Sequence, residues 1–180
     1  MKILTDTILG YEYSYSPNGF FQINLPVYEL ALQEIAKHIT TDHVIDMYAG
    51  VGTIGLSVAR DRQLTLVETD KSAFDEMVRN IPTNAANIHP VHAKSEEALE
   101  YITSDATIIV DPPRAGLHTA VVERLVEMTP PQIIYLSCNP VTQARDIAPL
   151  LTKYKIDLVQ PFNFFPRTPH IENLVVLTLI

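Results

Sequence analysis

A glycine-rich stretch near residue 50 carries the residue types of a cofactor-binding loop. An apolar run ends at Asp46, and Gly50 and Gly52 follow as the first glycines of a G-x-G-x-x-G pattern. Glycines in this spacing let the backbone turn tightly and let a ligand approach it closely. The next apolar run ends at Glu68, where a carboxylate can accept hydrogen bonds from ribose hydroxyls. The pattern therefore predicts a loop that binds a ribose-containing cofactor.

Asp46 bears on which cofactor this loop binds. Dinucleotide sites place a pyrophosphate on the helix N-terminus after the glycines, and a carboxylate beside it would repel that group. S-adenosylmethionine instead carries cationic ammonium and sulfonium groups, which a carboxylate attracts. Asp46 therefore favours S-adenosylmethionine. A dinucleotide-dependent enzyme remains the alternative, because Glu68 suits both cofactors.

Two more polar residues end later apolar runs. Asp111 is followed by Pro112 and Pro113, which fix the backbone just beyond the run. Cys138 follows the next run and is the single cysteine of the chain. Because the carboxyl ends of parallel strands meet at one edge of a sheet, we expect Asp111 and Cys138 beside the glycine-rich loop. A thiol placed there is a candidate nucleophile, and an inert buried cysteine is the alternative.

The elements that position these residues follow from hydrophobic periodicity. Short runs rich in β-branched residues alternate with stretches whose apolar residues recur at helical spacing. The predicted strands are 43–46, 64–68, 107–111 and 133–137, and the predicted helices are 26–38, 54–60, 71–80, 95–102, 119–128 and 140–151. Such alternation predicts parallel strands joined by right-handed crossovers, with helices on both faces of the sheet.

The two ends of the chain depart from this alternation. Residues 156–164 and 173–180 have strand-like patterns with no helix between them, so they are predicted to be antiparallel. Residues 1–24 are aromatic and are predicted as an irregular lead-in that packs on a domain formed by residues 25–180. The predicted fold class is α/β, with a mostly parallel, doubly wound sheet ending in an antiparallel hairpin. This Rossmann-like arrangement is typical of class I methyltransferases.

Composition narrows the class of protein further. The chain has 180 residues, of which 47% are apolar and 19% charged, with a formal net charge of −8. That length fits one domain, and no apolar run approaches the ~18 residues of a membrane span. The N-terminus lacks the apolar segment of a signal peptide, so we expect a cytoplasmic protein with no membrane partner. The acidic balance argues against a freestanding nucleic-acid binder.

Six motifs together resemble the RNA (uracil-5-)-methyltransferase family, in the family's order and over nearly the whole chain. They are FFQIN at 20–24, DMYAGVGTIGL at 46–56, LVETD at 66–70, DPPRAG at 111–116, LSCNPVTQARD at 136–146 and FPRTPHIENLVVL at 165–177. The resemblance implies S-adenosylmethionine as the cofactor, tRNA or rRNA as the substrate, and methylation of uridine at C5. It also implies the class I methyltransferase fold that the periodicity predicts.

The resemblance implies roles for individual residues as well. Cys138 corresponds to the nucleophile and Glu172 to the base that removes a proton. The corresponding cofactor contacts are Gln22, Tyr48, Thr53, Glu68 and Asp111, to which the loop analysis adds Asp46, Gly50 and Gly52. No metal ligand is predicted.

The chemistry explains why a thiol and a carboxylate are needed. Uracil C5 is a weak nucleophile, so a thiolate first adds at C6 and the resulting enolate carries charge to C5. C5 then takes the methyl group, and a general base removes the C5 proton so that the thiolate leaves. A free thiol has a pKa of about 8.5, so we expect the site to favour the thiolate, with Arg114 as an electrostatic helper. Partial burial is expected to raise the pKa of Glu172 toward neutrality.

The sequence also departs from the family pattern. Family members usually carry an OB-like RNA-binding domain, a central domain and in some cases a cysteine-ligated iron–sulfur cluster. None of these is recognisable in this sequence, and a single cysteine cannot hold such a cluster. A second hypothesis is therefore a cofactor-binding module that depends on a separate RNA-binding domain or subunit.

Overall fold

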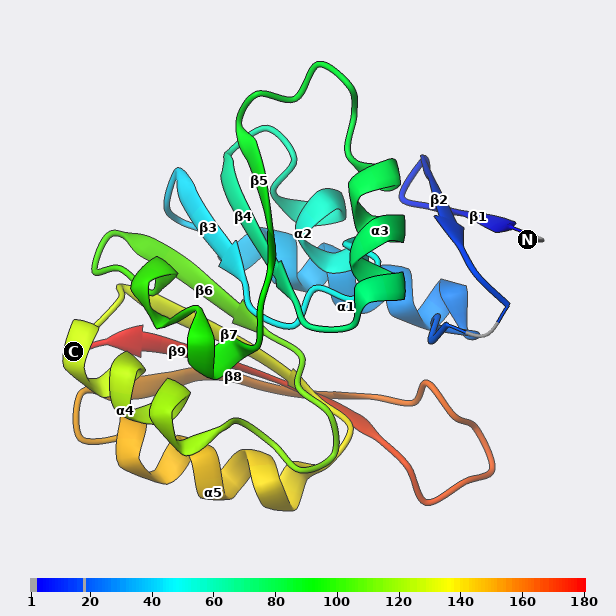
Figure 1. Ribbon diagram of the computed structural model, residues 1–180. Helices are drawn as coiled ribbons and strands as arrows, with labels where there is room; N and C mark the ends of the chain where they lie inside the picture. Colours follow the sequence, from blue (N-terminus) through cyan, green and yellow to red (C-terminus); the bar gives the residue numbers. More distant parts are fainter. Residues whose placement is uncertain (1–2, 18) are drawn as a thin grey trace.

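The computed structural model describes residues 3–17 and 19–180. Its main sheet has seven strands in the order β5-β4-β3-β6-β7-β9-β8 (Figure 1). The strands from β5 to β7 are parallel, and β9 lies antiparallel to both β7 and β8. The strand bounds are β3 His43–Asp46, β4 Gln63–Glu68, β5 Ile88–His92, β6 Ala106–Val110, β7 Gln132–Ser137, β8 Tyr154–Phe162 and β9 Glu172–Leu179. The predicted fold class is confirmed.

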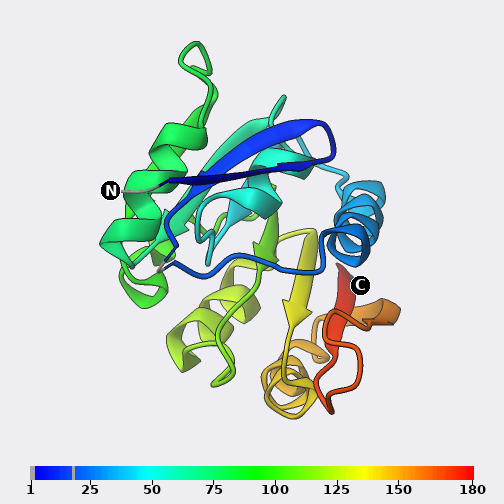
Figure 2. The same cartoon turned by 90° about the vertical axis from the view of Figure 1, so that its right-hand side faces the viewer.

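Helices cover both faces of this sheet (Figures 1 and 2). Their bounds are α1 Leu25–His38, α2 Thr53–Val58, α3 Lys71–Asn80, α4 Thr119–Met128 and α5 Pro140–Leu150. One apolar cluster joins the sheet to α1, α2 and α3, and a second joins it to α4 and α5. Alternate residues of the central strands enter opposite clusters, as the pleat of a strand requires. For example, Ile134 and Leu136 of β7 enter the first cluster, and Ile133 enters the second.

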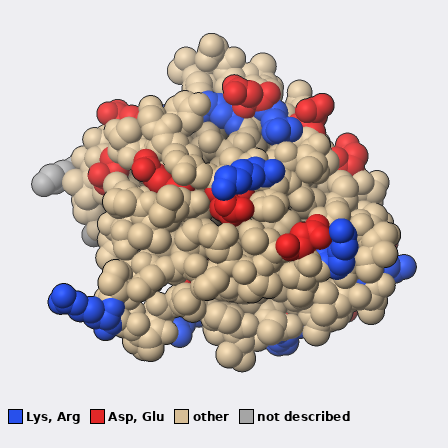
Figure 3. Space-filling view, turned by 180° about the vertical axis from the view of Figure 1, so that it is seen from behind, with Lys and Arg blue, Asp and Glu red and all other residues tan. Residues whose placement is uncertain are grey.

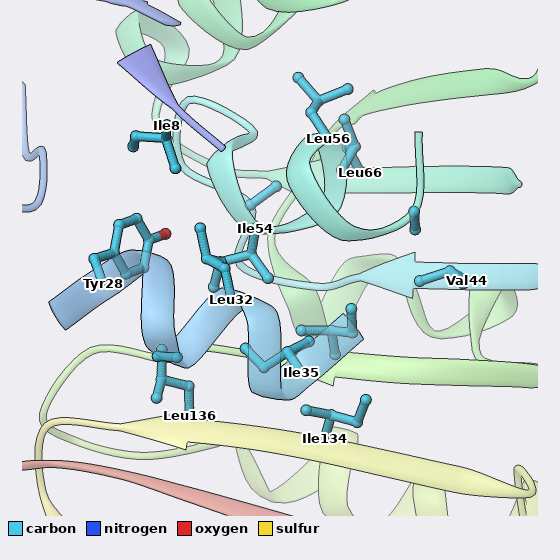
Figure 4. Packing of buried hydrophobic residues seen from close by; sticks show 14 of the residues in the cluster. Ile8, Tyr28, Leu32, Ile35, Val44, Ile54, Leu56, Leu66, Ile134 and Leu136 are labelled. Atoms are coloured by element: carbon cyan, nitrogen blue, oxygen red, sulfur yellow. The ribbon is translucent and has the colours of Figure 1, made fainter. Parts of the chain in front are cut away.

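Helix α1 places one apolar face on the centre of the sheet. Figure 4 shows Ile35 of α1 beside Ile134 of β7 and Leu32 of α1 beside Ile54 of α2. Leu32 and Ile35 are fully buried, which follows from their helical spacing. Tyr28 lies on the same helix nearer the carboxyl ends of the strands, where the candidate site is found. Helix packing therefore fixes one wall of that site.

Three predictions about local structure need correction. Within residues 1–24, the described part is not irregular, because β1 Leu4–Ile8 and β2 Tyr11–Tyr15 form an antiparallel hairpin. Residues 1, 2 and 18 lie outside the described part. Strand β5 was not predicted: as an edge strand it tolerates Pro90, and its exposed residues disguise the strand pattern. The predicted helix 95–102 is instead two short 3₁₀ turns at Ser95–Glu97 and Leu99–Tyr101.

The β1–β2 hairpin rests on the helical layer that contains α2 and α3 (Figure 2). Its turn is Leu9–Gly10, with φ of 49° and 82°. Two successive positive φ angles are typical of the tight turns that match strand twist. Ile8 and Tyr13 are fully buried, so the hairpin shares the core of the domain. No helix in the described residues is long and apolar enough to cross a membrane.

Candidate active site

A cavity of about 480 Å³ opens at the carboxyl ends of β3, β4, β6 and β7. Open α/β sheets bind their ligands at this edge, because the loops that follow the strands converge there. The predicted site residues that line the cavity are Gln22, Tyr48, Gly50, Thr53, Glu68, Asp111, Cys138 and Glu172. Segments that are far apart in the sequence therefore supply one site. A second, more open cleft of about 560 Å³ contains only Tyr48 of the predicted residues.

Glu68 fixes the glycine-rich loop from the end of β4. Its Oε2 accepts a hydrogen bond from Gly50 N at 2.8 Å, and its Oε1 accepts one from Asp70 N at 2.6 Å. Gly50 and Gly52 have φ of 56° and 86°, a region that residues with a side chain rarely adopt. Each carboxylate oxygen has a second lone pair, so Glu68 can still accept from a ligand hydroxyl. The carboxylate thus has both a loop-organising role and the capacity to bind a ribose.

Asp46 and Gly52, two of the predicted cofactor contacts, are not among the residues that line the cavity. Asp46 is fully buried, and its Oδ2 accepts a hydrogen bond from Gly55 N at 2.9 Å. Strand alternation directs its side chain behind the loop, toward α2. Burial raises the pKa of Asp46 to about 7. The hydrogen bond to Gly55 N ties Asp46 to the start of α2, and the charge of Asp46 still acts on the site, because it adds to the raised pKa of Asp111.

Gly55 allows α2 to pack closely on the sheet. A Cβ at this position would lie 2.5 Å from Leu66 Cδ2 and 3.1 Å from Asp46 Oδ2. We expect Gly55→Ala to lower the free energy of unfolding by about 1–3 kcal/mol, because the added methyl overpacks a buried contact. Urea denaturation measures this change, with Ser72→Ala at an exposed position of α3 as the control. Equal stability of Gly55→Ala and the parent chain would contradict this packing.

Cys138 and Glu172 are brought together by the register of two antiparallel strands. The last pair between β7 and β9 is Ser137 with Asn173, and Cys138 and Glu172 are the residues next to this pair. Both line the cavity, Cys138 partly exposed and Glu172 only 4% exposed. The two proposed chemical groups, 34 positions apart in sequence, thus lie at one strand end. Their spacing in the sequence gave no sign of this.

The electrostatics of the pair are set by burial and by neighbouring carboxylates. Burial raises the pKa of Glu172 to about 7, in the predicted direction. The pKa of the Cys138 thiol is also raised, first by burial and then by the negative charges of Glu172 and Asp111. Arg114 lowers it, but less strongly. Arg114 thus acts in the predicted direction, but burial and the two carboxylates outweigh it, so the residues around Cys138 together raise the pKa of the thiol.

Asp111 is a third buried carboxyl group at this site, beside Glu172 and Asp46. Burial raises its pKa well above the ordinary value, and the charges of Glu172 and Asp46 add to the shift. Tyr28 lines the cavity beside these carboxyls, and burial followed by the charges of Asp111 and Asp46 raises its pKa too. The sequence analysis did not identify Tyr28, although it lies one helical turn before Leu32 on the buried face of α1. A concentration of carboxyls of this kind favours a cationic ligand.

Three further predicted residues offer polar groups to the cavity. Gln22 is 8% exposed, and its Oε1 is buried without a hydrogen-bond partner among the described residues. Such an orphaned acceptor is costly unless a ligand satisfies it. Tyr48 accepts a hydrogen bond from Ser95 Oγ at 2.8 Å, which fixes its ring at the cavity wall. Thr53 lies at the first position of α2. Within the described residues, no cluster of His, Cys, Asp or Glu is arranged to hold a metal ion.

Comparison with known proteins gives consistent matches to this chain. A family model described as tRNA (Uracil-5-)-methyltransferase matches residues 99–180, and one described as Methyltransferase small domain matches residues 28–133. An uncharacterized RNA methyltransferase of Enterococcus faecalis is 36% identical over 97% of this chain and 40% of its own length. One of Nanoarchaeum equitans is 38% identical over 98% of this chain and 40% of its own length. The chain thus spans about two fifths of these relatives.

Among solved structures, a similar one is the Pyrococcus abyssi tRNA (uracil-54, C5)-methyltransferase in complex with S-adenosyl-L-homocysteine. Its TM-score is 0.89 with 32% sequence identity, over 99% of this chain and 45% of that one. The match includes the parallel strands, the antiparallel hairpin and the edge where the cavity opens. Sequence motifs, family models and fold agree, and this chain belongs to the RNA (uracil-5-)-methyltransferase family of class I S-adenosylmethionine-dependent methyltransferases.

Proposed function

We propose that this chain transfers a methyl group from S-adenosylmethionine to C5 of a uridine in tRNA or rRNA. The observation that carries the proposal is one cavity that joins the glycine-rich loop to the Cys138–Glu172 pair. A cofactor loop alone would fit many enzymes, and a lone cysteine would fit none in particular. Together they would place a bound methyl donor, a nucleophile and a base in one cavity.

The cavity residues fit the cofactor by their chemistry. Glu68 would accept from the ribose hydroxyls, and the unpartnered Gln22 Oε1 would accept from a donor group of the ligand. The carboxyl group of Asp111 and its acidic neighbours suit the cationic methionine end. When bound, the cofactor supplies an electrophilic methyl group and a positive charge. That charge, together with Arg114, would offset the carboxylates that disfavour the Cys138 thiolate.

The chain's own residues then perform two steps. The Cys138 thiolate adds to C6 of the uracil ring, which makes C5 nucleophilic enough to take the methyl group. Glu172 removes the hydrogen left on C5 as a proton, and elimination restores the ring and frees Cys138. Both residues line the cavity from adjacent strand ends, so one bound uracil can meet both. The raised pKa of Glu172 makes it a stronger base than an ordinary carboxylate.

The function is tested by incubating the chain with methyl-labelled S-adenosylmethionine and unmodified tRNA or rRNA transcripts. Digestion of the RNA to nucleosides should yield labelled 5-methyluridine. Label on any other nucleoside would overturn the assignment of uracil C5. No label on RNA, at high RNA concentration and with bound cofactor, would overturn autonomous activity.

The surface charge supports the second hypothesis, in which the chain depends on a separate RNA-binding domain or subunit. Figure 3 shows one face on which acidic and basic groups are mixed among mostly uncharged side chains, and the net charge of the chain is −8. Nucleic-acid binding normally relies on a surplus of Lys and Arg. If the chain binds S-adenosylhomocysteine but methylates RNA only after an RNA-binding domain or subunit is added, this second hypothesis replaces the first.

Tighter binding of NAD than of S-adenosylhomocysteine would instead favour a dinucleotide-dependent enzyme.

Removal of the Glu68 carboxylate should weaken cofactor binding. We expect Glu68→Ala to raise the Kd for S-adenosylhomocysteine about 10-fold or more, because it removes a charged hydrogen-bond acceptor and frees Gly50 N. Isothermal titration calorimetry measures the change. Glu97→Ala is the control, since Glu97 is an exposed acid paired with Lys94. If both variants bind alike, Glu68 is not a cofactor contact.

A further inference from the structure

A buried amide on α5 connects the two strands that carry the proposed chemistry. Gln143 is 1% exposed, and its Nε2 donates to Tyr135 O of β7 at 2.9 Å and to Asn173 O of β9 at 3.0 Å. Its Oε1 accepts from Asn173 Nδ2 at 2.7 Å. The amide therefore uses both N–H groups and its oxygen on two strands. Such an arrangement is satisfied only when β7 and β9 keep their present register.

This bridge lies at the strand end that bears the Cys138–Glu172 pair. Asn173 follows Glu172 directly and pairs with Ser137, which precedes Cys138. Glu172 is the first residue of β9, and the preceding segment 165–171 is largely exposed. The described residues give the Glu172 carboxylate no hydrogen-bond partner, so the backbone of β9 determines where it lies. Gln143 holds this backbone one residue away from Glu172, through the hydrogen bond from its Nε2 to Asn173 O.

Cys138 has additional anchors of its own. Ser137 Oγ accepts from Asn139 N at 3.1 Å, which closes the turn around the thiol. Asn139 Nδ2 donates to Arg114 O at 3.0 Å, and Thr142 Oγ1 donates to the same oxygen at 3.2 Å. Loss of the Gln143 bridge would therefore loosen Glu172 more than it loosens Cys138. Proton removal by Glu172 should then be slowed more than addition of the Cys138 thiolate.

We infer that Gln143 is a positioning residue for the proton-removal step, an inference that rests on the proposed function. After methyl transfer, C5 holds the new methyl group and one hydrogen, and C6 is bonded to Cys138 Sγ. Glu172 takes the C5 hydrogen as a proton, and the C–H electron pair becomes the C5=C6 double bond. The C6–S bond breaks, and its electron pair returns to the Cys138 thiolate. Gln143 keeps Glu172 within reach of that proton.

The test separates adduct decay from adduct formation. The chain is mixed with S-adenosylmethionine and a uridine-containing RNA in a single turnover, and the methylated covalent complex is followed on denaturing gels. For Gln143→Met, which keeps the side-chain volume but removes the three hydrogen bonds, we expect decay about 10-fold slower with formation little changed. Tyr154→Phe is the matched control, because it removes a buried bond to Pro130 O at the far end of the hairpin.

Each outcome decides for or against the inference. Accumulation of the methylated complex in Gln143→Met, but not in Tyr154→Phe, supports it. Equal slowing of formation and decay, or behaviour equal to Tyr154→Phe, overturns it. If Gln143→Met misfolds and loses S-adenosylhomocysteine binding, Asn173→Ala is used instead. This variant removes only the hydrogen bond from Asn173 Nδ2 to Gln143 Oε1, so we expect a smaller accumulation of the methylated complex. No accumulation in Asn173→Ala would refute the inference. A wild-type chain that forms no adduct contradicts the proposed function as well.

Discussion

Cys138→Ala should abolish methyl transfer to RNA while leaving cofactor binding within about twofold of the parent chain. The reason is chemical: without a thiolate at C6, uracil C5 does not become nucleophilic enough to attack the methyl group. Alanine is tolerated sterically, because Cys138 is partly exposed at the cavity wall and its removal deletes one atom. The loss in rate should be several powers of ten, since the whole covalent route is removed.

This result is measured with methyl-labelled S-adenosylmethionine and RNA, with calorimetric binding of S-adenosylhomocysteine as the control for folding. Loss of both activity and cofactor binding would point to a damaged cavity rather than to a missing nucleophile. Measurable 5-methyluridine formation by Cys138→Ala would show that methyl transfer does not pass through this thiol.

Glu172→Gln should stop the reaction at the methylated covalent complex. Glutamine keeps the shape of the side chain but cannot accept the C5 proton, so elimination of Cys138 should slow by about 10²–10⁴-fold. The uncharged amide also removes a negative charge that raises the pKa of the thiol. Adduct formation should therefore continue, and the complex should accumulate on denaturing gels. Glu123→Gln, at an exposed position of α4, should behave as the parent chain.

The pH dependence of the parent chain follows from the same residue. Burial raises the pKa of Glu172 to about 7, and only the ionised carboxylate accepts a proton. Decay of the methylated complex should level off above pH 7 and should fall about tenfold per unit of pH below it. Rapid-quench measurements of single turnovers give this rate. A decay rate independent of pH between 5 and 8, or a Glu172→Gln variant that releases product normally, would remove Glu172 from this role.

Local sequence patterns predicted the buried central strands and the helices that have one clearly apolar face. Strand 43–46 and helices 71–80 and 119–128 agree with β3, α3 and α4, because tertiary packing and local periodicity favour the same structure there. Strand β5 escaped prediction because an edge position permits Pro90 and exposed histidines. The hairpin at Leu4–Tyr15 lacks a strong turn signal, since its positive-φ pair begins with Leu9 rather than Asn or Gly.

For the site, too, one part could be predicted from the sequence and another part could not. Residues at the ends of predicted parallel strands, such as Glu68 and Cys138, were expected at one edge, and the cavity contains them. The pairing of Cys138 with Glu172 depends on the β7–β9 register, which a single sequence does not specify. The sequence does not show which way the Asp46 carboxylate points, because the pleat of β3 decides this, and in the structure it points toward α2.

The most direct test of the account is the mass of a trapped covalent complex. RNA that contains 5-fluorouridine should stall on the chain, because fluorine at C5 leaves no proton for Glu172 to remove. With S-adenosylmethionine present, intact-mass spectrometry should show one RNA and one methyl group added to the chain, and peptide mapping should place the bond on Cys138. A chain that binds the cofactor and methylates uridine in ordinary RNA, yet forms no such complex or forms it at another residue, would contradict the account.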